Sequence, residues 1–471
     1  MALIISLSGI RGVFGKDLTE SIAVKYAYTY ASFIKSVSNN PNPVIVIGAD
    51  TRPSGALIRD SIIGVLDCSF INVGIATTPL IQFAVRNYRA DGGIIITASH
   101  NEPYWNGFKF LGNSGAVITE KEINQVAANY SHFRDFHKIQ ERKIFDKGQE
   151  ALKKYSDFIL NFIGSEAIGA IRNSNQNIVV DPNGGTGSIT TKILEQLGIK
   201  FTAVNTTYGE FSRKVEPTED SLIYLKNIID DKKADFAAGF DCDADRVEIL
   251  LGNGQLMSGN YTLALIANEL LSKNKDARNK FVVVNNATSN VVRKVVEQNN
   301  SRLVEVEAGE SNVVEAMARH KAVLGGEGSS GGVILPPSTC RDGILTLVML
   351  LSIVAKRKKE LKDLIEELPR YYTLKTKIEF EHKKYNSIRN QLKSHYSKKG
   401  FEIEENGGVK GSLKIKSGKN SFVWFRASKT EGNYFRIIAD SNKKEEAKKL
   451  MEEAVDIFNK ANEHRWHGKS K

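Results

Sequence analysis

The most constraining feature of this 471-residue chain is one pattern that occurs three times. Short apolar runs rich in β-branched residues occupy residues 44–50, 178–181 and 281–284. Each run is followed by a turn of small polar residues, a helical apolar pattern and a second apolar run. A strand, a helix and a strand in that order are typical of α/β units, in which helices cover a sheet. The pattern therefore predicts three related α/β domains in series.

The last part of the chain has a different pattern of apolar and charged residues. From about Pro369, short alternating strands accompany one lysine-rich helical stretch, and a final helix is expected from Lys443 to about Lys460. This pattern predicts a smaller α+β domain. We therefore expect four domains, because a chain of this length exceeds one ordinary core. Their predicted ranges are 1–150, 151–255, 256–368 and 369–471.

Composition narrows the class of protein. Hydrophobic residues make up 41% and charged residues 25% of the chain, which is typical of a packed globular protein. The formal net charge of +11 favours anionic partners, either nucleic acid or phosphorylated small molecules. Much of the lysine lies in residues 356–359 and 375–419, interleaved with acidic residues. That distribution is typical of a solvated helical surface.

Cysteine usage and hydropathy favour a reducing compartment. The three cysteines, Cys68, Cys242 and Cys340, are odd in number and form no metal-binding pair. The most apolar stretch, residues 344–355, is shorter than the roughly 20 residues that span a bilayer. The apolar start also lacks the basic segment of a signal peptide. We therefore expect a cytoplasmic protein without a membrane partner.

A serine follows the apolar run at residues 93–96. The run continues into T-A-S-H-N, with Ser99 and His100 at its centre, and Lys109 lies downstream in N-G-F-K. Ligands of α/β proteins bind where strands end, so Ser99 is a candidate nucleophile. Taken alone, a capping serine in a turn is the more common explanation. The absence of G-x-S-x-G excludes the α/β-hydrolase pattern.

Three aspartates, Asp241, Asp243 and Asp245, alternate within a short loop between two apolar runs. Carboxylates this close repel one another unless a hard cation neutralises them, and ligation by oxygen alone suits Mg²⁺. A calcium-binding EF-hand is excluded, because Arg246 stands where that loop needs glycine and Gly252 where it needs glutamate. An acidic surface turn is the alternative, but it is unusual between two apolar runs.

Two further loops combine polar groups. The glycine-rich residues 325–332 include Glu327, whose carboxylate would oppose an anion but suits the hydroxyl groups of a sugar. A flexible turn is the more common explanation of so many glycines. The second loop, R-A-S-K-T-E-G, begins at Arg426 and precedes Arg436. Arginines, hydroxyls and loop amides together suit a phosphate, whereas a nucleic-acid contact would favour repeated aromatic and basic alternation.

Taken together, these four loops in this order resemble the α-D-phosphohexomutase superfamily, which includes phosphoglucomutase, phosphomannomutase and phosphoglucosamine mutase. T-A-S-H-N with N-G-x-K resembles the phosphoserine loop, D-x-D-x-D-R the magnesium loop, G-E-x-S the sugar loop and R-x-S-x-T-E the phosphate loop. The segment S-G-I-R-G around Arg11 is similar to the family's G-x-R-G. The match extends over nearly the whole chain. It implies three similar α/β domains with mixed sheets and a C-terminal α+β domain around a central cleft.

The resemblance also implies an activity. The protein would be an intramolecular phosphotransferase that moves phosphate between the 1- and 6-positions of glucose or mannose phosphate. Ser99 would carry the phosphoryl group, Mg²⁺ would be the cofactor, and a hexose 1,6-bisphosphate would be the intermediate and activator. The implied site residues are Ser99, Asp241, Asp243 and Asp245 for the metal, Arg11, His100, Lys109 and Arg246 around the transferring group, Glu327 and Ser329 on the sugar, and Arg426, Ser428 and Thr430 on the phosphate that is not reacting.

The sequence departs from the family pattern at several positions. Glu102 stands where proline usually follows the serine loop, and Gly331 or Gly332 stands where many bacterial members have a histidine. The resemblance therefore does not identify a general base. Glu310 occupies a position that varies among members and reads the substrate. These departures bear on the sugar more than on the type of reaction.

Alternative functions make different predictions. Phosphoglucosamine mutase is the alternative within the family. A phosphatase with the same serine and metal would release inorganic phosphate steadily. A basic nucleic-acid-binding protein would lose affinity steeply with salt, but it leaves the aspartate loop unexplained. A catalytically silent relative would have no reason to keep both Ser99 and the three aspartates. We expect a sugar phosphate as the partner, and no nucleic acid.

Overall fold

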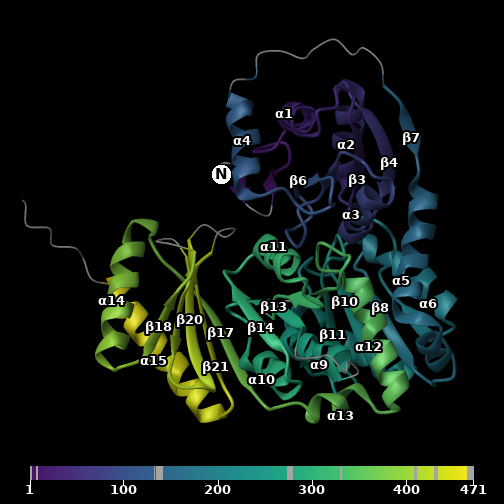
Figure 1. Ribbon diagram of the computed structural model, residues 1–471. Coiled ribbons are helices and arrows are strands. Elements are labelled where there is room, and N and C mark those ends of the chain that lie inside the picture. Colours follow the sequence, from purple (N-terminus) through teal and green to yellow (C-terminus); the bar gives the residue numbers. More distant parts are fainter. Residues whose placement is uncertain are drawn as a thin grey trace, which may run out of the picture.

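The structure is a computed structural model that describes residues 3–6, 9–131, 133, 142–272, 279–328, 331–407, 411–428 and 433–463. In these ranges the strands form four sheets, each built from its own stretch of the chain. Figure 1 shows the first sheet at the top, the second and third side by side below it, and the fourth beside the third. The predicted fold, three α/β domains followed by an α+β domain, is therefore confirmed.

The first domain is built on a mixed sheet of order β1-β2-β6-β5-β3-β4-β7. Its elements are β1 (Ile4–Ser6), β2 (Gly9–Val13), α1 (Glu20–Ser38), β3 (Val44–Ala49), α2 (Pro53–Val65), β4 (Ser69–Ile75), α3 (Thr78–Asn87), β5 (Gly92–Ile96), β6 (Trp105–Gly112), α4 (Glu120–Ser131) and β7 (Ile144–Asp146). Alternate residues of each strand face opposite sides of a sheet. Ile45 and Ile47 of β3 pack toward α1 and α2, whereas Val46 packs toward α3. Helices therefore bury both faces.

The second domain has the sheet order β12-β11-β10-β8-β9. Its elements are α5 (Gly148–Arg172), β8 (Asn177–Asp181), η1 (Thr186–Ile189), α6 (Thr190–Leu197), β9 (Lys200–Ala203), α7 (Glu219–Leu222), α8 (Leu225–Lys232), β10 (Phe236–Phe240), β11 (Val247–Leu251) and β12 (Leu256–Met257). Helix α5 is kinked at Gly164, which has a φ of +79°. It packs against α3 of the first domain and against α6. This long helix therefore joins the first two domains.

The third domain has the sheet order β14-β13-β15-β16. Its elements are α9 (Gly259–Ser272), β13 (Phe281–Asn285), α10 (Asn290–Gln298), β14 (Arg302–Val306), α11 (Glu310–His320), β15 (Leu324–Gly326), β16 (Val333–Ile334), α12 (Gly343–Arg357) and α13 (Leu361–Glu366). The apolar helix α12 packs against α5 and α9. One hydrophobic core consequently extends from α3 and α5 through the second and third domains.

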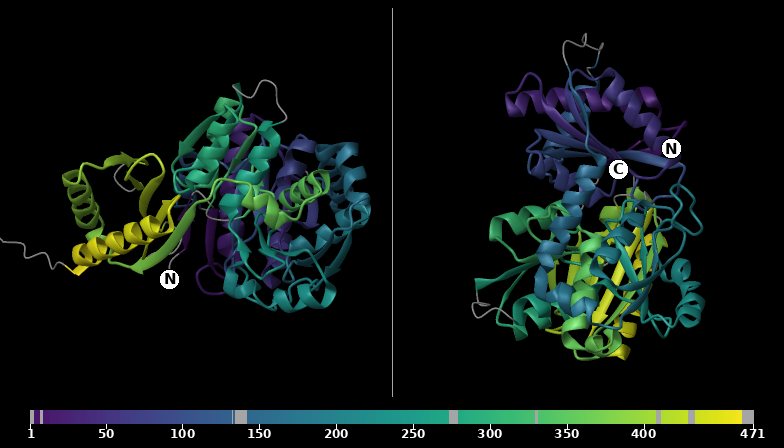
Figure 2. Two further views of the ribbon diagram at one scale, coloured as in Figure 1. Left: turned by 90° about the horizontal axis from the view of Figure 1, so that it is seen from below. Right: turned by 90° about the vertical axis from the view of Figure 1, so that its right-hand side faces the viewer.

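The fourth domain has an antiparallel sheet of order β17-β21-β20-β19-β18. Its elements are β17 (Tyr372–Glu379), η3 (His382–Lys384), α14 (Tyr385–Lys398), β18 (Glu402–Glu405), β19 (Leu413–Lys416), β20 (Ser421–Ala427), β21 (Tyr434–Ser441) and α15 (Lys444–Glu463). Helices α14 and α15 bury one face in a core of their own. The left view of Figure 2 shows this domain projecting to one side of the other three.

The same local arrangement places all four of the loops that the sequence singles out. Each loop connects two adjacent antiparallel strands: β5 and β6, β10 and β11, β15 and β16, and β20 and β21. In the first three domains, the loop follows a strand (β5, β10 or β15) that pairs in parallel with its other neighbour in the sheet (β3, β8 or β13). Equivalent loops in repeated domains therefore supply different chemical groups.

Within the described residues, no helix combines the length and apolarity needed to cross a membrane.

Candidate active site

Ser99 lies in the loop between β5 and β6 and is 2% exposed. Its φ of +52° is a left-handed conformation that a serine keeps only where the surroundings hold it. Its backbone N–H donates to Thr97 Oγ1, and Arg52 donates to its carbonyl oxygen, both at 2.8 Å. The hydroxyl donates to Asp241 Oδ2 at 3.2 Å. The loop thus directs the Ser99 hydroxyl at the aspartate loop of the second domain.

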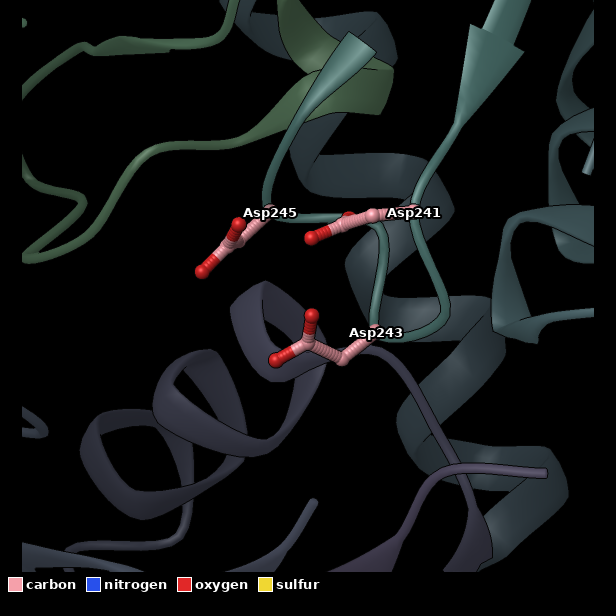
Figure 3. A group of neighbouring side chains, drawn as sticks. All are labelled: Asp241, Asp243 and Asp245. Carbon is pink, nitrogen blue, oxygen red and sulfur yellow. The ribbon is translucent and has the colours of Figure 1, made fainter. Parts of the chain in front are cut away.

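The aspartates of that loop are all buried and point toward one another (Figure 3). One carboxylate oxygen from each of Asp241, Asp243 and Asp245 lies within 4.8 Å of the other two. Asp243 Oδ1 and Asp245 Oδ1 accept no hydrogen bond from the described residues although both atoms are buried. Buried anionic oxygens without donors are costly unless a cation binds them. Three carboxylates in this geometry can therefore hold a hard metal ion.

The charges around the aspartates differ from one carboxylate to the next. Burial and the neighbouring aspartates raise the pKa of Asp241 well above its usual value. Burial also opposes ionisation of Asp245, yet the charges of Lys109 and Arg341 hold the pKa of Asp245 below its usual value. A bound cation would therefore favour the ionised form of Asp241, which burial and the neighbouring aspartates oppose.

Lys109 connects the first domain to the aspartate loop from its position on β6. Its Nζ donates to Asp243 Oδ2 at 2.8 Å and to Asp245 Oδ2 at 3.2 Å. Burial disfavours its charge, but these two carboxylates outweigh burial and raise the pKa of Lys109. Thr78 donates to the same Asp243 oxygen at 2.6 Å. The ammonium group is therefore charged and fixed beside the candidate metal site.

Three more predicted residues surround the serine loop. Arg11 donates to Asn101 Oδ1 at 3.0 Å, and burial lowers the pKa of Arg11 to about 10. Burial and the charges of Arg246 and Arg11 lower the pKa of His100 well below its usual value. Arg246 Nε lies 3.7 Å from Asp245 Oδ1. At neutral pH the loop is therefore lined by charged arginines and a neutral histidine.

Two arginines at the site were missed by the sequence analysis. Arg52 forms an ion pair with Asp50 and bonds the Ser99 carbonyl oxygen. Arg341 lies between three carboxylates: it donates from Nε to Glu310 at 2.9 Å, lies 3.5 Å from Glu327 and lies 3.7 Å from Asp245. Neither arginine belongs to one of the four loop motifs, so local sequence carried no signal for them.

The glycine-rich loop places Glu327 in the cleft and keeps its carboxylate in one orientation. Glu327 Oε1 accepts from Asn285 Nδ2 at 2.8 Å and from the Gly309 N–H at 3.0 Å. A Cβ on Gly331 would lie 1.7 Å from the carbonyl oxygen of Val247, so only glycine fits there. This close approach excludes a larger side chain at Gly331 in this conformation of the loop. The predicted residue Ser329 lies outside the described residues.

The fourth loop brings Arg426 and Ser428 to the same cavity, next to Arg436. Arg426 Nε lies 3.1 Å from Glu307 Oε1 of the third domain, and burial lowers the pKa of Arg426. Thr430 lies outside the described residues. The arginine expected to bind phosphate is therefore paired with a carboxylate across the domain boundary.

One cavity of about 250 Å³ joins the four loops. Nine of the predicted site residues line it: Arg11, Ser99, His100, Lys109, Asp245, Arg246, Glu327, Arg426 and Ser428. Glu310 and Arg341 line the cavity as well. Asp241 and Asp243 are not part of the lining, but Asp241 is hydrogen-bonded to Ser99 and Asp243 to Lys109. All four domains contribute side chains to this cleft.

A buried serine beside a carboxylate cluster, in a cleft lined by arginines, is suited to phosphoryl transfer. Family models described as domains I, III and II of phosphoglucomutase/phosphomannomutase match residues 3–135, 258–372 and 153–254, respectively. The protein is accordingly a mutase, an intramolecular phosphotransferase. The chain belongs to the phosphoglucomutase/phosphomannomutase family, within the phosphohexomutase superfamily.

Similar proteins cover almost the whole chain. The chain is 33% identical over 461 residues to a phosphoglucomutase/phosphomannomutase of Thermococcus kodakarensis, covering 96% of this chain and 98% of that one. It is 29% identical over 466 residues to a probable phosphoglucosamine mutase of Pyrococcus abyssi, covering 96% and 97%. A solved phosphoglucomutase/phosphomannomutase family protein of Burkholderia thailandensis has the same fold, with a TM-score of 0.80, 22% identity and 98% of both chains covered.

Proposed function

We propose that this protein moves phosphate between the 1- and 6-positions of glucose or mannose phosphate, by way of a phosphorylated Ser99 and a hexose 1,6-bisphosphate. The Ser99 hydroxyl, 3.2 Å from Asp241 Oδ2 and facing a cavity shared by all four domains, is the observation that carries this proposal. A phosphoserine carries about −1.5 to −2 charges. The basic side chains of the cavity offset that charge.

Mg²⁺ is the cofactor that the aspartate loop fits best. Asp241, Asp243 and Asp245 would hold it together with an oxygen of the phosphoryl group on Ser99. Two observations support this assignment. The Oδ1 atoms of Asp243 and Asp245 are buried and accept no hydrogen bond from the described residues, and all the ligand atoms offered to the metal are hard oxygens. When bound, the ion neutralises charge on the phosphoryl oxygens.

The basic residues of the cavity stabilise the negative charge of the phosphoryl group. Lys109, Arg11 and Arg246 lie around the serine loop and carry positive charge at neutral pH. As negative charge spreads over the phosphoryl oxygens during transfer, these fixed cations stabilise it without rearrangement. The neutral His100 is free to exchange hydrogen bonds with the phosphoryl group, because its Nδ1 has no partner among the described residues. Catalysis rests on position and charge.

The phosphate that is not reacting binds, in this proposal, to Arg426, Ser428 and Thr430. Arg426 presents a planar fork that matches phosphate oxygens. A substrate phosphate then displaces Glu307, which is the present partner of Arg426. Binding energy gained at this remote end helps position the reacting end in the first domain.

The sugar itself lies, in this proposal, against Glu327 and Ser329. Glu327 Oε1 accepts from two donors, so a sugar hydroxyl would donate to Oε2, which lies 3.5 Å from Arg341 Nη1. Glucose and mannose differ at one hydroxyl, and a single carboxylate accepts from either. The relative at 33% identity, named phosphoglucomutase/phosphomannomutase, supports this pair. Glucosamine phosphate is the second candidate, because other relatives are named phosphoglucosamine mutase.

Cytoplasmic location and the absence of a nucleic-acid partner stay predictions.

The substrate assignment is tested by direct comparison. Purified protein with Mg²⁺ and a trace of hexose 1,6-bisphosphate is assayed against the 1-phosphates of glucose, mannose and glucosamine. We expect conversion of the glucose and mannose compounds to their 6-phosphates, and a marked lag when the bisphosphate is omitted. Exclusive conversion of glucosamine 1-phosphate would replace the proposal with the second candidate. Steady release of inorganic phosphate would indicate a phosphatase.

A further inference from the structure

Glu310 is a cleft carboxylate that the metal and sugar assignments do not use. It is the first residue of α11 and follows Gly309, whose φ is +139°. Its side chain lines the same cavity as Ser99 and Glu327. At 18% side-chain exposure it is largely shielded from solvent but open to the cavity. The fold thus presents a second glutamate to a bound sugar.

Arg341 holds this carboxylate by one oxygen only. Glu310 Oε2 accepts from both the backbone N–H and the Nε of Arg341, at 3.1 and 2.9 Å. Glu310 Oε1 accepts no hydrogen bond from the described residues. The remaining guanidinium nitrogens of Arg341 face Asp245 and Glu327, at 3.7 and 3.5 Å. One oxygen is therefore fixed and the other is available to a ligand.

The reaction needs a proton acceptor, because the sugar hydroxyl that attacks the phosphoserine must lose its proton. Lys109 is charged and cannot accept a proton, so the described candidates in the cavity lining are His100, Glu216, Asp245, Glu310 and Glu327. His100 lies among cations that lower its pKa well below its usual value. Glu216 is half exposed and hydrogen-bonded to Arg246. Asp245 belongs to the metal site, which leaves Glu310 and Glu327.

The surroundings of the two glutamates separate their roles. Both oxygens of Glu327 are engaged, Oε1 by two hydrogen bonds and Oε2 by Arg341 Nη1 at 3.5 Å, so Glu327 is a fixed acceptor for a sugar hydroxyl. Glu310 Oε1 has no such partner among the described residues. Burial raises the pKa of Glu310, and the charge of Asp245 adds to this, while Arg341 and Lys109 oppose it. The thiol of Cys340 is also buried, and the charge of Glu310 contributes to raising the pKa of Cys340. A carboxyl whose pKa is raised toward the working pH exchanges protons more effectively than an ordinary one.

We propose that Glu310 is the general acid–base residue of the phosphoryl transfer and that Arg341 is the residue that positions it. This inference rests on the proposed function. As the sugar hydroxyl oxygen bonds to the phosphorus on Ser99, its proton passes to Glu310 Oε1. The Oγ–P bond breaks, and its electron pair stays on Ser99 Oγ, in the cavity that the charged Lys109 also lines.

The return transfer runs these steps in reverse. Ser99 Oγ attacks the other phosphate of the bisphosphate, the bond from that phosphorus to the sugar oxygen breaks, and the sugar oxygen takes the proton back from Glu310. Glu310 therefore ends each turnover ionised, with protons and electron pairs balanced. The sugar turns over in the cleft between the two transfers, and Glu310 serves both positions from one place.

The test follows the transfer of labelled phosphate from Ser99 to a sugar phosphate in a single turnover across a range of pH. The Ser99 phosphate is loaded beforehand by long incubation with labelled hexose 1,6-bisphosphate. We expect Glu310→Gln to slow the transfer by about 100-fold or more and to abolish the loss of rate at low pH. Glu310→Asp keeps a carboxylate, so the transfer rate of this variant should again fall at low pH. Glu315→Gln, an exposed change on the same helix, should behave as wild type.

The possible outcomes distinguish a failure of the role of Glu310 from a failure of the proposed mutase function. If the wild-type protein never carries label on Ser99, the proposed function fails. If the wild type transfers label and Glu310→Gln transfers it within about threefold of that rate with the same dependence on pH, only the role of Glu310 fails. A change in KM alone for Glu310→Gln, with an unchanged transfer rate, would make Glu310 a sugar-binding residue and also overturn the inference.

Discussion

Arg341 contacts carboxylates from three separate segments of the chain. Asp245 belongs to the aspartate loop, Glu327 to the glycine-rich loop, and Glu310 to the start of α11. The arginine side chain is 7% exposed, so these charges are shielded from water. Buried carboxylates need a compensating charge, and here one guanidinium supplies it to all three. Arg341 therefore links the candidate metal site to the candidate sugar site.

Loss of this arginine should be costly to the fold. We expect Arg341→Ala to lower the free energy of unfolding of the metal-free protein by about 3–5 kcal/mol, because it leaves buried carboxylates without their partner. Arg319→Ala removes an exposed ion pair with Glu315 and should cost about 0.5 kcal/mol or less. Urea unfolding of the two variants measures the difference. Equal small losses would show that Arg341 does not stabilise the site.

Single residues were predictable where local sequence carried their chemistry. Ser99 follows a buried strand, and the three aspartates alternate within one loop, so each had a signal in a few adjacent residues. Arg341 and Arg52 had none, because their partners at the site are distant in the sequence. Arg341 reaches Asp245 across 96 positions and Arg52 reaches Ser99 across 47. Only tertiary structure brings such groups together.

Among the elements, β11 anchors the glycine-rich loop from the neighbouring domain. Glu248 of β11 accepts from the Gly331 N–H at 2.6 Å. Burial raises the pKa of Glu248 to about 7, although the Gly331 N–H and the charge of Lys375 on β17 oppose the shift. The loop, the second domain and the fourth domain therefore meet at one titratable carboxyl.

This carboxyl should make stability depend on pH. Its pKa is raised from 4.5 to about 7 in the folded protein, so the folded state keeps the proton while the unfolded state releases it. The contribution of Glu248 is complete below about pH 4.5 and is lost as the pH rises through about 7. We expect this loss to be on the order of 3 kcal/mol and to be absent in Glu248→Gln. Unfolding free energies of both proteins at several pH values test this, and parallel curves would contradict it.

Strands and helices were predictable where hydrophobic periodicity was strong. The runs at residues 178–181 and 281–284 lie within β8 and β13, and the first run contains β3. The pairing of the strands was not predictable in the same way. Whether β6 returns antiparallel beside β5 depends on the whole sheet and not on its own apolar pattern. The shared position of the four loops became visible only through this pairing.

At the scale of the whole molecule, the fourth domain contacts the third through a polar surface with a small apolar centre. Trp424 packs near Ala287 and Ala308, and its Nε1 donates to Asn286 Oδ1 at 3.0 Å. Glu307 accepts from Ser412 Oγ at 2.6 Å and pairs with Arg426. Surfaces of this polarity are typical of domains that can move relative to one another. The contact holds Arg426 at the cleft.

The phosphate role of Arg426 can be tested through its partner. We expect Arg426→Ala to raise KM for the sugar phosphate by about 30-fold or more, because a charged hydrogen bond is lost. Glu307→Gln should strengthen inhibition by inorganic phosphate, since the phosphate no longer competes with a carboxylate. In the double variant, the effect of Glu307→Gln should disappear. Normal KM and normal phosphate inhibition in Arg426→Ala would show that this loop does not bind phosphate.

The cleft as a whole was predictable only through the resemblance to a family. Four loops with complementary chemistry pointed to one site, but their meeting depends on how α5 and α12 pack and on how the fourth domain docks. The helix contacts use apolar surfaces that are alike in many proteins, and the fourth domain docks through polar groups that are far apart in the sequence. The order of the loops along the chain therefore indicated the family, whereas the spacing of the loops along the chain did not indicate how close they lie in space.

The most direct test of the account asks whether Ser99 carries the phosphate that the sugar receives. Protein charged with labelled hexose 1,6-bisphosphate and Mg²⁺ is digested, the label is located, and its transfer to unlabelled glucose 1-phosphate is timed against turnover. We expect the label on Ser99 alone, its transfer at a rate at least equal to kcat, and a folded but inactive Ser99→Ala variant. Full turnover by Ser99→Ala, or label that leaves Ser99 only as inorganic phosphate, would contradict the account.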